Sequence, residues 1–179
     1  MSRNNLQYIS TYSTPTDELY FLGTVDQDLF SITARISLYI TPDLSIQYYG
    51  SPFSATRKYN NIKKVLNPRA ADYNDRFYTY NQNEITFNGR NNTYEIDEGY
   101  NGSTDYTLGN PDLSFKEFRS NLVLRWEYNP GSTIYLVWSQ NRSNVSGYEL
   151  FNMGRTLNRV FDIYPDNIFM IKINHWFSL

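Results

Sequence analysis

The clearest pattern in the chain is a strict alternation of apolar and polar residues over positions 28–41. Apolar side chains occupy every second position from Phe30 to Ile40, and mainly polar ones stand between them. A period of two is typical of a β-strand with one apolar face, and this segment is longer than the usual strand of about five or six residues. Thr41-Pro42-Asp43 then predicts a tight turn, because proline has no N–H to place in a ladder.

The same design recurs along the chain and predicts an all-β, antiparallel fold. A second hairpin is expected around Asn129-Pro130-Gly131-Ser132, which is a turn by composition. The predicted strands cover residues 5–12, 28–41, 43–53, 113–128, 132–142 and 167–178, within a single domain over 1–179. Long polar connections are expected over 13–27, 54–112 and 143–166. Short strands are expected inside the middle connection at 76–82, 84–89 and 93–97, and a short helix or turn inside the last one at 156–163.

Each long strand therefore carries an apolar row and a polar row. The apolar rows, with the aromatic residues at their ends, contain Phe30, Ile32, Ile36, Leu38, Leu122, Leu124, Trp126, Tyr128, Phe169, Ile171, Ile173 and Phe177. The polar rows contain Arg35, Arg119, Arg125, Glu127 and Lys172. In a soluble sandwich or barrel the apolar rows face the core. In a membrane barrel they face lipid, and the polar rows face the lumen.

Three features favour a transmembrane β-barrel of the bacterial outer membrane. The strands are about ten residues or longer, which suits a tilted strand that crosses a bilayer. Short turns alternate with long connections, as periplasmic turns alternate with extracellular loops. Tyrosine, tryptophan and phenylalanine gather at strand ends, where an interfacial girdle lies. The prediction is that arginine and glutamate pair across strands and fill a narrow lumen.

Composition excludes several other classes. A net charge of −2 without a basic run argues against a nucleic-acid partner. The chain has no cysteine, so it has neither disulfides nor thiolate metal sites. The mean hydropathy is −0.58, and no apolar stretch reaches the roughly 18 residues of a membrane helix. Because MSRNNLQY lacks the features of a secretory signal peptide, a mature chain or a piece of a longer one is expected.

Several blocks of the sequence resemble a Bacteroidota family of unknown function. They are 41–53, 74–77, 118–133 continuing to 137–140, 166–169 and 172–177. The resemblance implies the C-terminal outer-membrane barrel domain of a longer protein, whose N-terminal module is similar to family 9 carbohydrate-binding domains. It therefore implies a glycan-handling context and a chain that forms the last portion of a larger barrel. The final strand, from Lys172 onward, also resembles the signal that the barrel-assembly machinery reads, with Asn174 where glycine is usual.

Candidate chemistry is sparse. His175 is the single histidine and lies in an apolar row near a strand end, so an interfacial role is expected. Glu117 and Glu127 share a face but lie ten residues apart, roughly 33 Å at extended rise, which is too far for a glycosidase pair. The loop from Glu95 to Asp105 has oxygen ligands but not the spacing of a calcium loop. No catalytic, cofactor-binding or metal site is predicted, and the chain is not expected to be an enzyme.

The sequence thus predicts an outer-membrane barrel segment that anchors the protein and displays extracellular loops. Its expected partners are outer-membrane lipid and the assembly machinery, with other outer-membrane subunits or extracellular glycan as further candidates. Three alternatives remain: a channel or transporter for small solutes, a subunit of a larger outer-membrane complex, and a soluble sugar-binding β-domain. The predicted strands number six, whereas the smallest single-chain barrels have about eight. Either the missing strands come from another chain or segment, or residues 54–112 contain more strands than the pattern predicts.

Overall fold

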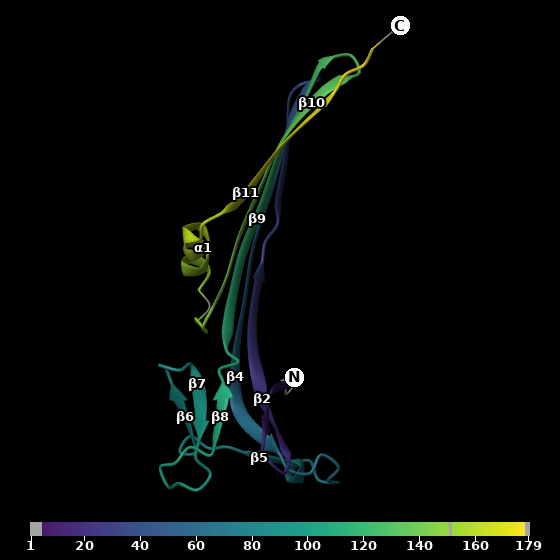
Figure 1. Ribbon diagram of the computed structural model, residues 1–179. Coiled ribbons are helices and arrows are strands. Elements are labelled where there is room, and N and C mark those ends of the chain that lie inside the picture. Colours follow the sequence, from purple (N-terminus) through teal and green to yellow (C-terminus); the bar gives the residue numbers. More distant parts are fainter. Residues whose placement is uncertain (1–4, 151, 178–179) are drawn as a thin grey trace. The chain divides into compact units, whose positions relative to one another are not determined.

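A computed structural model describes residues 5–150 and 152–177 (Figure 1). The chain divides into two compact units. Unit 1 comprises Met1–Gln27 and Arg57–Leu113, and unit 2 comprises Asp28–Thr56 and Ser114–Leu179. Strands joined in antiparallel register dominate both units, which confirms the predicted all-β class. Within the described residues, no helix is long and apolar enough to cross a membrane.

Unit 1 is built around a buried aromatic and aliphatic core. Its strands are β1 (Leu6–Ser13), the first part of β2 (Glu18–Ser31), the last part of β4 (Leu44–Val65) and β5 (Phe77–Thr79), preceded by a 3₁₀ turn (Asn74–Arg76). A second, three-stranded sheet contains β6 (Ile85–Asn88), β7 (Thr93–Ile96) and β8 (Tyr106–Gly109). The core cluster consists of Phe21, Ile62, Tyr80, Ile96 and Leu108. Along β2, buried positions such as Phe21 and Val25 alternate with less buried ones, as a strand with one buried face requires.

Unit 2 is a long antiparallel sheet with one helix. Its strand order is β3 (Ala34–Thr41), the first part of β4, β9 (Leu113–Asn129), β10 (Ser132–Ser146) and β11 (Asp166–Asn174). The helix α1 (Met153–Asp162) lies in the connection from β10 to β11 (Figure 1). The predicted hairpins that turn at 41–43 and 129–132 are both present. The helix expected over 156–163 is confirmed, although it begins three residues earlier.

Several predicted boundaries are wrong. The connection predicted over 13–27 is largely strand, because β2 begins at Glu18 and its residues Phe21 and Val25 are buried in alternation. The connection predicted over 54–112 begins as strand, since β4 continues to Val65, and it contains β8 as an unpredicted strand. The connection predicted over 143–166 begins inside β10. Residue 151 of that connection, and positions 178–179 of the predicted last strand and C-terminal signal, lie outside the described residues.

The strand predicted over 28–41 is also interrupted, and proline explains the break. β2 ends at Ser31 and β3 begins at Ala34. The β3–β4 register places Ile32 opposite Pro52, which has no N–H to donate to the Ile32 carbonyl. The hydroxyl of Ser51 donates to that carbonyl instead, at 3.1 Å, and the Ile32 N–H still reaches the Pro52 oxygen at 3.2 Å. A side-chain donor therefore replaces the missing ladder bond.

Candidate functional site

The candidate site is the sheet of unit 2, whose register sorts the side chains onto two faces. Directly opposite residues share a face, so each cross-strand row can be followed through β9, β10 and β11. Three consecutive rows are apolar, and we call the side that they share the apolar face: Leu122, Trp138 and Phe169; Leu124, Leu136 and Ile171; Trp126, Ile134 and Ile173. On β3 and β4, Ile36 lies opposite Tyr48 and Leu38 opposite Ile46. The predicted apolar rows therefore line up across strands.

Among the residues of unit 2 that the structure describes, none covers most of the apolar face. Phe169, Ile171 and Ile173 are 74%, 69% and 64% exposed, and Leu38 is 55% exposed. Phe30, at the end of β2, is half-buried. The face also holds a groove of about 290 Å³ between β9, β10 and β11, lined by Leu122, Leu124, Leu136, Trp138, Phe169 and Ile171. A continuous apolar patch of this kind marks a surface that contacts something other than water.

The opposite side, which we call the polar face, carries all five of the predicted charged residues. The register places Arg125, Tyr135 and Lys172 in one row, with the Lys172 ammonium 5.9 Å from the Tyr135 ring centroid. Arg119 and Glu127 follow on the same side of β9, because both lie an even number of residues from Arg125. A further row pairs side chains of β9 and β10 through a 3.4 Å hydrogen bond from Ser139 to Asn121. Arg35 lies 5.6 Å from the Tyr49 ring centroid and lines a shallow pocket with Tyr49 and Asn121.

The ion pairs on the polar face differ from the predicted ones. Arg125 pairs with Glu127 at 2.7 Å, and Arg119 pairs with Glu117 at 2.8 Å. Both pairs join residues i and i+2 of the same strand, so the prediction that arginine and glutamate pair across strands is wrong. Alternate residues of one strand point to the same side, which lets these long side chains meet without spanning to a neighbouring strand.

An aromatic cluster gathers around the turn between β9 and β10. His175 accepts or donates a 2.8 Å hydrogen bond with the Tyr128 hydroxyl, and its ring lies 4.4 Å from that of Phe177. Gly131 has a φ of +79°, and a Cβ there would stand 3.2 Å from the Trp176 Cβ. Trp126 lies on β9, 6.1 Å from the Tyr128 ring. Trp126, Tyr128, His175, Trp176 and Phe177 therefore gather their aromatic rings at this end of the sheet.

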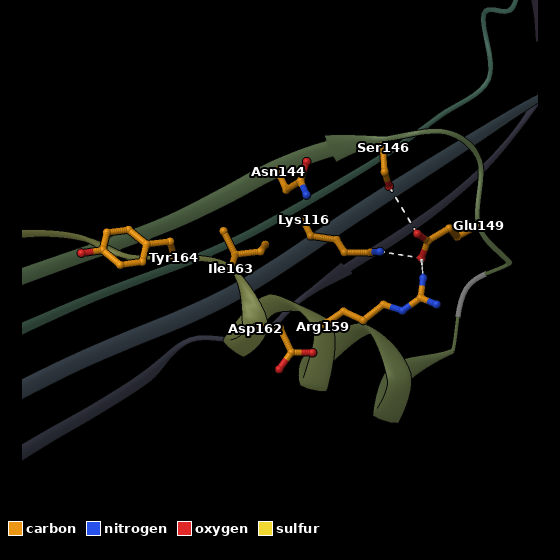
Figure 2. A pocket seen from close by; sticks show the side chains of 8 residues that line it. All are labelled: Lys116, Asn144, Ser146, Glu149, Arg159, Asp162, Ile163 and Tyr164. Carbon is orange, nitrogen blue, oxygen red and sulfur yellow. Dashed lines mark hydrogen bonds and ion pairs between the residues drawn. The ribbon is translucent and has the colours of Figure 1, made fainter. Parts of the chain in front are cut away.

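A polar pocket of about 420 Å³ lies between α1 and the β9–β10 pair (Figure 2). At its centre the Glu149 carboxylate accepts from Lys116 at 2.6 Å and forms a second ion pair with Arg159. Lys116 comes from β9 and is 6% exposed. Its hydrogen bond is the largest cause that lowers the pKa of Glu149, so this carboxylate stays ionised at neutral pH. No local sequence pattern marks this site, because Lys116 lies 33 positions before its partner Glu149.

Two carboxylates of unit 1, those of Glu98 and Asp97, accept hydrogen bonds from other groups of the protein. Glu98 accepts from Tyr80 and Lys64, both at 2.5 Å, while Asp97 accepts from the Asn101 and Gly102 N–H groups of its loop. Burial, and then the bond to Glu98, raises the pKa of Tyr80. In the part of the chain that the structure describes, no group of three or more histidine or acidic side chains is placed to hold a metal ion. The predicted oxygen-rich loop over 95–105 thus uses its oxygens for local hydrogen bonds.

Searches against protein-family models, curated proteins and solved structures find no match for this chain.

Proposed function

We propose that unit 2 is part of the wall of a bacterial outer-membrane β-barrel, which anchors the protein and presents its long connections outside the cell. The observation that carries the proposal is the uncovered apolar face of a single-layer sheet. In water each exposed apolar side chain costs free energy in proportion to its area, at about 25 cal/mol per Å². Lipid removes this cost, because hydrocarbon chains are as apolar as the side chains that they touch.

Strand length and side-chain order support the same proposal. β9 has 17 residues and β10 has 15, and a tilted strand needs about 9–11 to cross a bilayer. Along β9 the apolar row ends in Trp126 and Tyr128 beside the short turn, where a girdle of amphipathic aromatic rings would meet the headgroups. The charged residues on the opposite face would line the interior.

The two edges of the unit 2 sheet define what must complete the wall. Contacts between Asp43 and Glu127 and between Phe53 and Phe115 show that β4 and β9 are antiparallel. With the registers of the other pairs, this makes the edge strands β3 and β11 run in the same direction. A closed antiparallel wall then needs an odd number of additional strands between them. Without those strands, unpaired backbone groups would lie in lipid at a cost of several kcal/mol each.

The native tryptophans supply the test. All three tryptophans of the chain, Trp126, Trp138 and Trp176, belong to unit 2. We expect their fluorescence in reconstituted vesicles to be quenched strongly by lipids brominated on the acyl chain, and weakly by acrylamide in the aqueous phase. A chain that is monomeric and folded without detergent, with tryptophans open to acrylamide, would contradict the proposal.

A second measurement tests closure of the wall separately. Closed membrane barrels resist SDS until they are heated, because every strand edge is paired. If the isolated chain shifts in electrophoretic mobility after boiling, it closes a barrel by itself. If its tryptophans are quenched by brominated lipid but no shift occurs, the additional strands come from another segment or another chain.

A further inference from the structure

The helix α1 has two different exposed flanks beside its buried face. Thr156 and Val160 are buried. Met153 and Phe161 are each 51% exposed on one side of this buried stripe. At 100° per residue, Arg155 and Arg159 fall on the other side of the buried stripe, and the polar residue Asp162 lies next to them. A helix with an apolar flank and a basic flank is typical of segments that lie in a membrane interface.

Contacts with the strands fix which way each flank faces. The row of Phe118 and Arg142 holds the C-terminal end of α1: the rings of Phe118 and Phe161 are 5.0 Å apart, and Arg142 donates to the carbonyl oxygens of Phe161 and Ile163. Lys116, two residues further from the apolar rows, lies on the side of Arg159 and Glu149 (Figure 2). The apolar flank of α1 therefore faces the apolar rows of the sheet, and the basic flank faces away from them.

The position of α1 along the strands matches the level of lipid headgroups. The last apolar row contains Trp138 and Phe169, and the next row contains Gln140 and Asn167. The side-chain oxygen of Asn167 accepts a 2.9 Å hydrogen bond from the Trp138 indole. Arg142 follows two residues after Gln140, about 13 Å from Trp138 along the strand. Headgroup layers occupy the outer 5–8 Å or so on each side of a bilayer, and strand tilt shortens the separation along the membrane normal. The C-terminal end of α1 therefore contacts the sheet just beyond the last apolar row.

The charge at this level is positive. Around α1, the cations Lys116, Arg142, Arg155 and Arg159 stand against the carboxylates Glu149 and Asp162, an excess of two positive charges on the helix and the groups that contact it, although the chain as a whole carries −2. Arg142 binds carbonyl oxygens rather than a carboxylate, so its charge is not neutralised by its partners. Arg155 is exposed. Guanidinium groups are well suited to phosphate, because their donors match two of its oxygens.

We propose that α1 is an interfacial helix on the lipid-facing side of the wall, and that Arg155 and Arg159 bind the phosphate of an anionic lipid headgroup. This inference depends on the proposed membrane location of unit 2. The occupant is lipid rather than a soluble anion, because the same helix carries both a basic flank and exposed apolar side chains. Lipid supplies both an acyl chain for Met153 and Phe161 and a phosphate for the arginines.

Lipid selectivity tests the proposal on the full chain. The chain is reconstituted into phosphatidylcholine vesicles that contain a trace of dansyl-labelled phosphatidylglycerol or dansyl-labelled phosphatidylcholine, and energy transfer from its tryptophans is compared. We expect a preference for the anionic lipid that falls about fivefold in Arg155→Gln, as a basic residue near an anionic surface contributes about this factor. The matched control is Arg90→Gln, which removes an exposed arginine of unit 1 and should leave the preference unchanged.

The outcomes separate this inference from the proposed function. Quenching by brominated lipid without any anionic preference would overturn the inference and leave the membrane wall standing. Absence of quenching would overturn both. Loss of the preference on adding inorganic phosphate, but not chloride at equal ionic strength, would assign the arginines to a soluble anion and would also overturn the inference. A preference lost in Arg90→Gln as well would show a general charge effect rather than a site on α1.

Discussion

Units 1 and 2 place their apolar side chains in opposite ways, although both contain residues of β2, β4 and β9. Among the described residues, the buried hydrophobic side chains of unit 1 are Phe21, Val25, Tyr59, Ile62, Tyr80, Ile96 and Leu108. Those of unit 2 are Phe118 and Val160, and both lie where α1 meets the sheet. The same alternating pattern therefore encloses a core in one unit and leaves an open apolar face in the other.

The difference shows that alternation specifies a face but not the medium that the face contacts. In unit 1 a second set of strands supplies the opposing layer, so Ile96 and Leu108 are 0% and 2% exposed. In unit 2 the apolar face extends over several strands, and the described residues of that unit form no opposing layer, which a lipid environment makes favourable. Changes that treat the two units alike should therefore have unequal effects.

The largest contrast is expected between two phenylalanines. Phe21→Ala should lower the free energy of unfolding of unit 1 by about 3–5 kcal/mol, because it empties space in a packed core. Phe169→Ala removes the same atoms from a side chain that is 74% exposed and should cost less than about 1 kcal/mol. Chemical denaturation in detergent, followed by tyrosine circular dichroism, measures both. Equal losses would mean that unit 2 has a packed core of its own.

A charge on the apolar face should have the next largest effect. Ile171→Arg places a guanidinium in the middle apolar row and should reduce the stability of the inserted chain by about 2–4 kcal/mol, the cost of arginine at a bilayer midplane. Met170→Arg is the matched control, because Met170 is the neighbouring residue and points to the polar face. Urea titration of vesicle-bound protein compares the two variants. If Met170→Arg is the more disruptive one, the lipid-facing and interior faces have been exchanged.

In unit 1, Glu84 should make stability depend on acid pH. Glu84 is 2% exposed and accepts from the Tyr78 hydroxyl and, at 2.8 Å, from the Asn81 N–H. These bonds, that from Tyr78 foremost, lower its pKa below the ordinary value of 4.5. Because the folded pKa is the lower one, the contribution is complete above about pH 4.5 and is lost as the pH falls through the folded pKa. Glu84→Gln should therefore flatten the acid limb of the stability profile and cost about 1–3 kcal/mol at neutral pH.

The tyrosine partner provides an independent readout of the same pair. The bond to Glu84 is the main cause that raises the pKa of Tyr78 to about 12, so its contribution to stability is present below pH 10 and is lost as the pH rises toward 12. Glu84→Gln should bring this pKa back toward 10 in an ultraviolet titration. The control is Glu18→Gln, which removes a similar partner from the exposed Tyr20 and should affect stability much less. A Tyr78 pKa that does not move would contradict the hydrogen bond.

How far the sequence predicts this molecule depends on the range of each interaction. Alternation is local, so the rows through Leu122, Trp126 and Ile171 and the two hairpin turns follow from the sequence and are confirmed. The start of β2 does not follow from alternation, because its apolar residues from Leu19 to Leu22 form a continuous run. The docking of α1 could not be predicted, because Arg142 binds backbone carbonyl oxygens and no residue type marks such an acceptor. The closed barrel, its lipid contacts and its location stay predictions.

The smallest effect is expected at the turn between β9 and β10, where backbone and aromatic girdle meet. Gly131 has a positive φ, which costs other residues roughly 1 kcal/mol or more, and Gly131→Ala would also press a methyl group against Trp176 at 3.2 Å. The loss should therefore be about 1–2 kcal/mol, together with a change in Trp176 fluorescence. Gly109→Ala is the control, because no atom lies within 4 Å of a Cβ there and its φ is not positive. A stability loss with unchanged fluorescence would assign the effect to the turn alone, whereas equal losses in both variants would remove the special role of this turn in holding the aromatic cluster.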